Sequence, residues 1–441
     1  MRLSMMLVWL LASGIGAAQA APLTLSDAWQ RLQSASDLLK AEQLATDRAR
    51  SEREVAGALG HPQLALSGTY AYLDDPIALD LNPALPGFPI PIPTLPLTER
   101  DIYRASLVGS WPIYAGGRIQ AAQAVKQAEL EVRLQEQEIQ RRERFTVLVE
   151  RYFGLQLASQ NLALHQSQVA ALERHLTNAE KLEGQGQIAS VERMNAAVAV
   201  DQARIARAQA ERQHSLAQRA LDSLLQLSQV APATRDAIPD APPTLAQLQQ
   251  GMARSHPALA LFDAKTRQAQ GSIAAERGRY KPEVGLFGSY TLAEDNSILS
   301  ELEPEWLVGV RVRVPLFSND GRGDRVRAAK SAELEARHRK AQTEQDLELL
   351  LASQYANLEQ ARYELNALDS AERLARENRR LRELAFRQGL GTSLEQVDAD
   401  QRLMEVQLGK ARARYQYLVA LAQVTTLGGD LEQMINWMEP Q

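Results

Sequence analysis

The amino-acid sequence predicts a mainly α-helical protein with a small β part, folded as two tandem repeats. Three observations predict this class: the sequence resembles itself half a chain later, two long intervals lack proline, and four short segments alternate apolar and polar residues. Proline is absent from 113–231 and from 316–439. These intervals are rich in Ala, Leu, Gln, Glu and Arg, which favour helices. We therefore expect long helices joined to a few strands.

The chain begins with the features of a cleaved secretory signal peptide at 1–20. Arg2 supplies the positive charge, 5–12 the apolar stretch and 18–20 (AQA) the small-x-small cleavage site. The alternative, a membrane anchor, is disfavoured because this apolar stretch is shorter than the ~20 residues of a spanning helix. No later segment has 18 consecutive apolar residues, so a membrane role would require β-strands. We expect export, with a mature chain that begins near Ala21.

The internal repeat is visible when positions about half a chain apart are compared. Pro62 and Tyr70 match residues 220 positions later, whereas Tyr152 matches Tyr355 at an offset of 203. The 17 residues of difference fall in the proline-rich stretch 73–101, which we expect to be a loop. The chain is therefore a tandem duplication.

Each repeat is expected to contain the same elements in the same order. These are a helix of about 35 residues, two short strands and a long helical hairpin. The expected first repeat is 21–229, with strands at 63–73 and 102–113 and a hairpin at 117–228; an irregular linker follows at 230–243; the second repeat is 244–427, with strands at 283–293 and 305–316 and a hairpin at 322–427; and 428–441 form an irregular C-terminal tail.

Leucines in the two hairpins recur at a spacing of seven residues. Leu148 and Leu155 belong to this series in the first hairpin, and Leu351 and Leu358 repeat it in the second. A seven-residue apolar repeat is typical of a coiled-coil seam. Taken alone, the helices are equally compatible with an isolated structural coiled coil.

Each of the four expected strands is near ten residues long and alternates apolar with polar positions, except at Phe287. This is about the length of a transmembrane β-strand, and aromatic residues near strand ends are typical of an interfacial girdle. The predicted girdle residues are Tyr70, Tyr72, Trp111, Tyr290 and Trp306. Because four strands cannot close a membrane barrel, several copies would have to share one. The alternative is a small soluble sheet.

The polar faces of the same strands carry three arginines, namely Arg104, Arg311 and Arg313. In a barrel these side chains would line the lumen and make its outer part cationic. In a soluble sheet they would be ordinary solvent-facing charges.

Composition removes most other functions. The chain has no cysteine, and its six histidines never take a metal-binding spacing, so no metal site, cofactor or thiol chemistry is expected. With 54 acidic and 49 basic residues, nothing favours nucleic-acid binding. The glycines near 116 and 321 lack a phosphate-binding motif, and no carboxylate pair is distinguished as catalytic. We expect a protein that is not an enzyme.

Two pairs of duplicated turns carry a resemblance to a known family. The strand-to-helix turns are PIYAGGR at 112–118 and PLFSNDGR at 315–322, and the hairpin turns are GQIASVERMNA at 186–196 and GLGTSLEQVDA at 389–399. With them, nearly all of the mature chain resembles the TolC family of outer-membrane efflux and secretion channels, the outer membrane factors. The resemblance implies a homotrimer whose chains pool four strands each into a 12-stranded outer-membrane β-barrel, continued by a 12-helix periplasmic α-barrel of coiled coils.

The resemblance also implies a function and partners. The protein would be the passive exit duct of a tripartite efflux pump or a type I secretion system, with a periplasmic adaptor (membrane fusion) protein, an inner-membrane transporter and outer-membrane lipid as partners. Drug efflux, metal-ion efflux and protein secretion remain open as cargo classes. Without a cysteine after the signal peptide, the chain is not expected to be lipidated. The alternative from another class is a periplasmic coiled-coil scaffold or adaptor without a pore.

Site residues follow from the same match at the hairpin tips. A periplasmic gate and selectivity ring is expected from Glu395, Asp398 and Glu192, and the adaptor-contact tips from Gly186, Ser190, Gly389 and Ser393. The alternative for the acids is ordinary helix capping, because carboxylates in a first turn interact favourably with the helix dipole. Asn195 departs from the family's acidic pattern, and Phe386 and Gly391 replace the tyrosine and arginine of the ionic latch found in some members.

Overall fold

The computed structural model describes residues 22–79, 94–234, 238–239, 242–317, 320–429 and 431–438. The predicted signal peptide lies outside these residues, as do parts of the expected loop, linker and tail. The described chain is mainly helical with a small antiparallel sheet, which confirms the predicted fold class. Its described residues divide into two compact units: a helical unit, within 1–43, 136–259 and 342–441, and a sheet unit, within 44–135 and 260–341.

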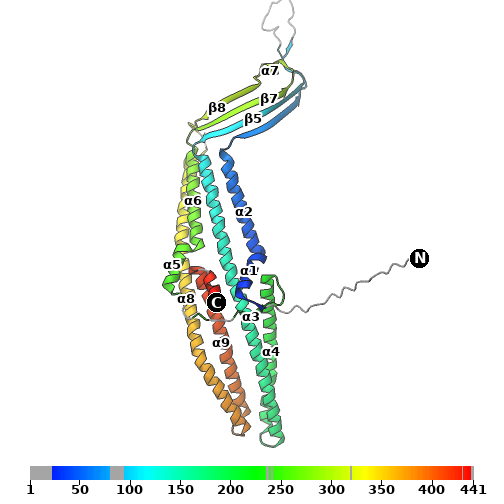
Figure 1. Ribbon diagram of the computed structural model, residues 1–441, viewed down its shortest axis with the longest axis vertical. Coiled ribbons are helices and arrows are strands. Elements are labelled where there is room, and N and C mark those ends of the chain that lie inside the picture. Colours follow the sequence, from blue (N-terminus) through cyan, green and yellow to red (C-terminus); the bar gives the residue numbers. More distant parts are fainter. Residues whose placement is uncertain are drawn as a thin grey trace, which may run out of the picture. The chain divides into compact units, whose positions relative to one another are not determined.

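The sheet unit contains four long strands that pair in the order β2-β5-β7-β8, all antiparallel (Figure 1). The strands are β2 (Gln63–Tyr72), β5 (Asp101–Ala115), β7 (Glu283–Glu294) and β8 (Trp306–Arg313). A short ladder of β3 (Ala78–Leu79) with β4 (Leu95–Pro96) lies within the stretch expected to be a loop, and the one-turn helix α7 (Ile298–Glu301) precedes β8. Both β2 and β8 are edge strands, so each has one side without a partner in this sheet.

The register of the sheet places the alternating residues on two faces. Leu66 pairs with Leu107, which pairs in turn with Tyr290, and Tyr290 pairs with Trp306. Residues directly opposite each other across strands share a face. One face is therefore apolar in all four strands, as the alternation predicts. Phe287, which breaks the pattern, pairs with Gly309, where a side-chain Cβ would lie 2.7 Å from the Phe287 ring. The aromatic ring covers the bare backbone of that glycine.

A tight glycine turn joins β5 to the helix that follows. Gly116 has φ +64°, and a Cβ there would lie 2.5 Å from the carbonyl oxygen of Gly278. Only glycine accepts both this conformation and this approach. After the turn the chain continues as α3 (Arg118–Gly184), which begins beside the end of α6 (Pro257–Gly278).

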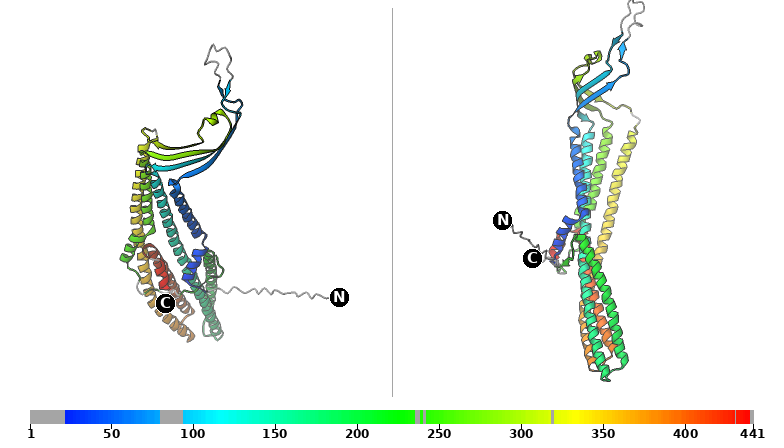
Figure 2. Two further views of the ribbon diagram at one scale, coloured as in Figure 1. Left: turned by 45° about the horizontal axis from the view of Figure 1, so that its top comes forward. Right: turned by 90° about the vertical axis from the view of Figure 1, so that its right-hand side faces the viewer.

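Two helical hairpins form most of the helical unit (Figures 1 and 2). The first is α3 with α4 (Ser190–Leu225), and the second is α8 (Arg322–Arg387) with α9 (Ser393–Gly428). With 67 residues, α3 is about 100 Å long at ~1.5 Å per residue. The leucines of the seven-residue repeat are buried in one core; Leu148, Leu351 and Leu358 have no exposed surface. The predicted seam is therefore confirmed.

Three local features differ from the expectation. Each expected 35-residue helix is two helices: α1 (Leu25–Ala35) and α2 (Asp37–Gly57) are separated at Ser36, and α5 (Leu245–Ser255) and α6 at His256. At the second break Pro257 disfavours helical geometry in the preceding residue. The tail, expected to be irregular, contains α10 (Leu431–Met438), which buries Met434 and Met438.

The start of the described chain is held against the linker. Here β1 (Pro22–Leu23) pairs in parallel with β6 (Ala231–Pro232), inside the segment expected to be irregular. The buried hydroxyl of Tyr152 donates a hydrogen bond to the carbonyl oxygen of Leu23 (2.6 Å). It also accepts hydrogen bonds from the amides of Ala233 (3.0 Å) and Thr234 (2.9 Å). One tyrosine from α3 therefore fixes both strands.

Candidate functional site

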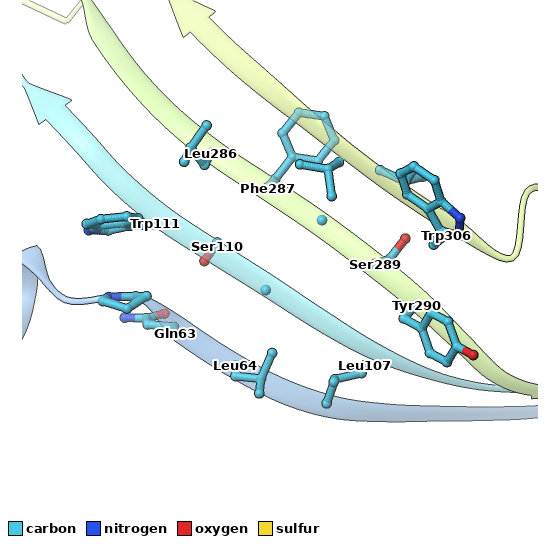
Figure 3. Close-up of a pocket in the computed structure, with 15 residues that line it drawn as sticks. Gln63, Leu64, Leu107, Ser110, Trp111, Leu286, Phe287, Ser289, Tyr290 and Trp306 are labelled. Atoms are coloured by element: carbon cyan, nitrogen blue, oxygen red, sulfur yellow. The ribbon is translucent and has the colours of Figure 1, made fainter.

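The apolar face of the sheet carries many exposed apolar side chains. Its leucines and valines are 62–74% exposed at Leu64, Leu66, Val308 and Val310. Figure 3 shows side chains of this face, including Trp111, Leu286, Tyr290 and Trp306, on neighbouring strands. A contiguous apolar surface of this kind marks a site of contact with another apolar medium or molecule.

Aromatic side chains lie at two levels of this apolar face. Tyr70 and Tyr103 are paired near one end of the strands, whereas Trp111 and Tyr114 lie near the other. The eleven steps from Tyr103 to Tyr114 span ~37 Å along the strand at ~3.4 Å per residue. In a barrel with strands tilted by about 40°, this corresponds to a height of ~28 Å, close to the ~25 Å apolar band of outer-membrane barrels. The predicted girdle residues share one face: Tyr70, Tyr72, Trp111, Tyr290 and Trp306.

The three arginines of the polar face have different surroundings. Arg104 forms ion pairs with Glu294 (3.5 Å) and Glu303. The guanidinium of Arg311 lies over the ring of Phe287, 4.9 Å from its centroid. Arg313 lies opposite Glu283 in the register. Two carboxylates counter the charge of Arg104, and the lumenal role of the three arginines stays a prediction.

The two hairpin tips have the same backbone geometry. Gly186 and Gly389 adopt φ +73° and +71° just after α3 and α8. In both tips the glycine amide bonds the carbonyl three residues back, and the next amide bonds the carbonyl five residues back. This pattern is the Schellman motif, in which a left-handed glycine ends a helix. Gly186, Ser190 and Gly389 are exposed at the tips, as adaptor contacts would need to be.

The acidic residues of the second tip have distinct surroundings. Thr392 caps α9, and Glu395 completes the capping box by accepting a hydrogen bond from the Thr392 amide (3.2 Å). Glu395 also pairs with Arg382 (3.2 Å), whereas Asp398 is exposed. Both acids line one hollow of about 530 Å³ beside Arg382 and Arg402. The two carboxylates share a face, and Glu395 has the capping role as well.

Glu192 joins the two hairpins. Its carboxylate accepts a hydrogen bond from the amide of Ser393 (2.8 Å), although 201 residues separate them. Ser393 is fully buried, and its Oγ lies 2.7 Å from Nε2 of His175 on α3. The His175 ring packs edge-to-face on Phe386, with centroids 4.6 Å apart. No signal in one sequence pairs His175 with Ser393.

Neither a helical membrane span nor a metal cluster is found among the placed residues. Within the described ranges, each helix is too short or too polar to cross a membrane. The same residues contain no group of three His, Asp or Glu side chains arranged to hold a metal ion.

Comparison with known families identifies the chain. The profile of the family described as "Outer membrane efflux protein" matches residues 28–226 and 248–430. The chain belongs to this family. It is an outer-membrane efflux channel of the TolC type, and it is not an enzyme. The two matched segments correspond to the tandem repeats. Family membership also excludes the alternative of a scaffold or adaptor without a pore.

Solved structures of such channels share the fold. VceC of Vibrio cholerae is 15% identical, with 92% of this chain and 96% of that chain covered and a TM-score of 0.75. CmeC of Campylobacter jejuni is 13% identical, with 94% and 90% covered and a TM-score of 0.73. The open state of MtrE from Neisseria gonorrhoeae is 17% identical, with 92% and 89% covered and a TM-score of 0.74. No curated protein sequence matches the chain.

Proposed function

We propose that three copies of this efflux channel share one 12-stranded barrel and one 12-helix tunnel, which together form the exit duct of a tripartite efflux pump. The observation that carries the proposal is a four-stranded sheet with one apolar face and two unpaired edges, β2 and β8. An edge left open in lipid would leave backbone amides and carbonyls without partners, which costs several kcal/mol per group. Pairing β8 of one copy with β2 of the next removes every edge.

Family membership supports the same stoichiometry, because TolC-family channels form trimers in efflux pumps. The duct conducts passively, and the inner-membrane transporter supplies the energy. A periplasmic adaptor contacts the exposed tips near Gly186, Ser190 and Gly389. Ser393 is left out of this contact because its side chain is buried in the present conformation.

The gate is assigned to the second hairpin tip. Three copies of Glu395 and Asp398 place six carboxylates around the periplasmic end of the tunnel, which favours cations over anions. Glu192 is assigned a different role from the predicted one: its carboxylate holds the Ser393 amide and so ties the tips together. The mature chain is exported by a cleaved signal peptide and, having no cysteine, carries no N-terminal lipid.

Cysteine cross-linking between strand edges tests the shared barrel. The chain has no cysteine, so introduced cysteines are the only reactive thiols. Leu66→Cys on β2 is combined with a cysteine at Trp306, Val308 or Val310 on β8, all on the apolar face. After oxidation of the purified protein, at least one pair is expected to give a ladder that ends at a covalent trimer.

The matched control moves the first cysteine to Leu107 on β5. That strand is paired on both sides within its own chain, so its cysteine cannot reach β8 of another copy. A ladder that ends at the dimer, or equal cross-linking of the Leu107 control, would contradict the shared barrel.

A further inference from the structure

The contact between the two hairpin tips is built around one buried histidine. His175 lies on α3, nine residues before its end, and is only 2% exposed. Its Nε2 is 2.7 Å from Oγ of Ser393, the first residue of α9, and its ring packs on Phe386 in the last turn of α8. The imidazole therefore touches both helices of the other hairpin.

The surroundings favour a neutral imidazole. Phe386 forms a small apolar cluster with Ala179 and Ala196, and Nδ1 of His175 has no hydrogen-bond partner among the described atoms. Burial lowers the pKa of His175 below its usual value. The groups that face it act in the opposite direction. The carboxylates of Asp400 on α9, Glu192 on α4 and Glu383 on α8, together with the side chain of Gln396, favour the protonated form.

The three carboxylates are already engaged, which limits how well they can compensate a charge on the ring. Asp400 pairs with Arg379, Glu383 pairs with Arg387, and Glu192 accepts the Ser393 amide. The cost of burying the charged ring therefore exceeds the attraction. A protonated His175 needs water, and water reaches it only if the tips separate.

We propose that His175 is a proton-responsive latch, which holds the two hairpin tips of one chain together when neutral and releases them when the surroundings become acidic. The inference rests on the proposed function, because release has a consequence only if the tips close a tunnel. The packed junction is favoured above the ordinary imidazole pKa of about 6.5. Below that value, the equilibrium constant for packed against separated tips in one chain falls by at most tenfold for each pH unit. The fall ends at the lowered pKa of the packed histidine.

Distances between spin labels on the two tips test the latch directly. The exposed residues Gln187 and Gln388, one from each tip, are replaced by cysteines in the cysteine-free chain and labelled. The trimer in detergent, diluted with unlabelled chains, is measured by pulsed EPR at pH 7.5 and pH 5.0. The intrachain distance is expected to be short at pH 7.5 and to shift to longer values at pH 5.0.

Two histidine variants separate the latch from other effects of acid. Gln at position 175 can still hydrogen-bond Ser393 but cannot titrate, so His175→Gln is expected to keep the short distance at both pH values. His165→Gln, ten residues earlier on the same helix, is the matched control and is expected to shift as the unmodified protein does. An unchanged distance in the unmodified protein, or a shift that survives in His175→Gln, would overturn the latch.

A third variant covers the case in which His175→Gln does not fold. Ser393→Ala keeps the imidazole and removes its partner, so the tips are expected to be looser already at pH 7.5. A distance identical to that of the unmodified protein at both pH values would also overturn the proposal.

Conductance in planar bilayers then separates this inference from the proposed function. A channel that conducts with no pH-dependent change in tip distance would refute the latch and leave the duct intact. Tips that separate in acid without any conductance would support the latch and refute the duct.

Discussion

Replacing Gly251 with alanine is expected to destabilise the helical unit by about 1–3 kcal/mol, the usual cost of overpacking a tight contact. Gly251 lies where α5 crosses the end of α9. A Cβ there would overlap with the carbonyl oxygen of Gly428 and lie 3.1 Å from its carbonyl carbon. The contact is reciprocal, because a Cβ on Gly428 would lie 2.8 Å from the Cα of Leu248. All these neighbours are backbone atoms, so no side chain can rotate away.

The helix propensity of alanine works against this cost. Alanine in a helix interior is about 1 kcal/mol more favourable than glycine. The matched control is therefore Gly409→Ala on α9, where the nearest atoms are side-chain carbons of Leu368 at 3.7 and 3.8 Å. That substitution adds only ordinary contacts and is expected to leave stability unchanged or raise it by up to about 1 kcal/mol.

Thermal unfolding of the two variants, followed by the helical circular-dichroism signal of the trimer in one detergent, measures the difference. The Gly251→Ala midpoint is expected to be several degrees below that of the unmodified protein, and the Gly409→Ala midpoint at or above it. A destabilisation of 1–2 kcal/mol changes the folded-to-unfolded ratio by about 5–30-fold, well within reach of the assay. A Gly251→Ala midpoint equal to that of Gly409→Ala would refute the close crossing of α5 and α9.

Three further predictions follow from other residues. Tyr152→Phe leaves the buried amide of Thr234 without its partner, at a cost of about 1–3 kcal/mol. Hydrogen exchange is therefore expected to accelerate at Leu23 and Ala233, whereas the exchange rates of the hairpin tips stay unchanged. Burial, reinforced by Arg142, lowers the pKa of His256 to about 4, so its neutral form stabilises the fold above pH 6.5 and this contribution is lost as pH falls to about 4. In denaturant titrations, the free energy of unfolding should therefore depend less on pH in His256→Gln than in the unmodified protein. Glu395→Gln with Asp398→Asn is expected to reduce cation preference in single-channel recordings without loss of the capping geometry; unchanged selectivity would remove the acidic ring.

Local sequence patterns predicted the elements and faces of this fold. The leucine spacing at Leu148 and Leu155 identified the seam, because a coiled coil is specified by near neighbours on one helix. The alternation of the strands identified the apolar face, because the pleat alone decides which residues share it. Phe287, which broke the pattern, lies over Gly309 on the neighbouring strand, and that pairing is known only from the register.

Features that depend on contacts distant in the sequence were not predicted. No strong sequence signal marks the break between α1 and α2 at Ser36. The break between α5 and α6 at His256 could have been predicted from Pro257. The helix α10 was missed because it is only eight residues long, and its apolar residues are explained by packing against α9 and α1. The tip junction was missed because 218 residues separate His175 from Ser393. The match of the hairpin turns located the tips, but only the packing shows that Ser393 faces inward.

Conductance of the purified mature protein in planar bilayers, with its oligomeric mass measured in the same detergent, tests the shared duct most directly. We predict a trimer that gives discrete conductance steps. A monomer, or a species that needs no detergent and conducts nothing, would contradict the shared barrel.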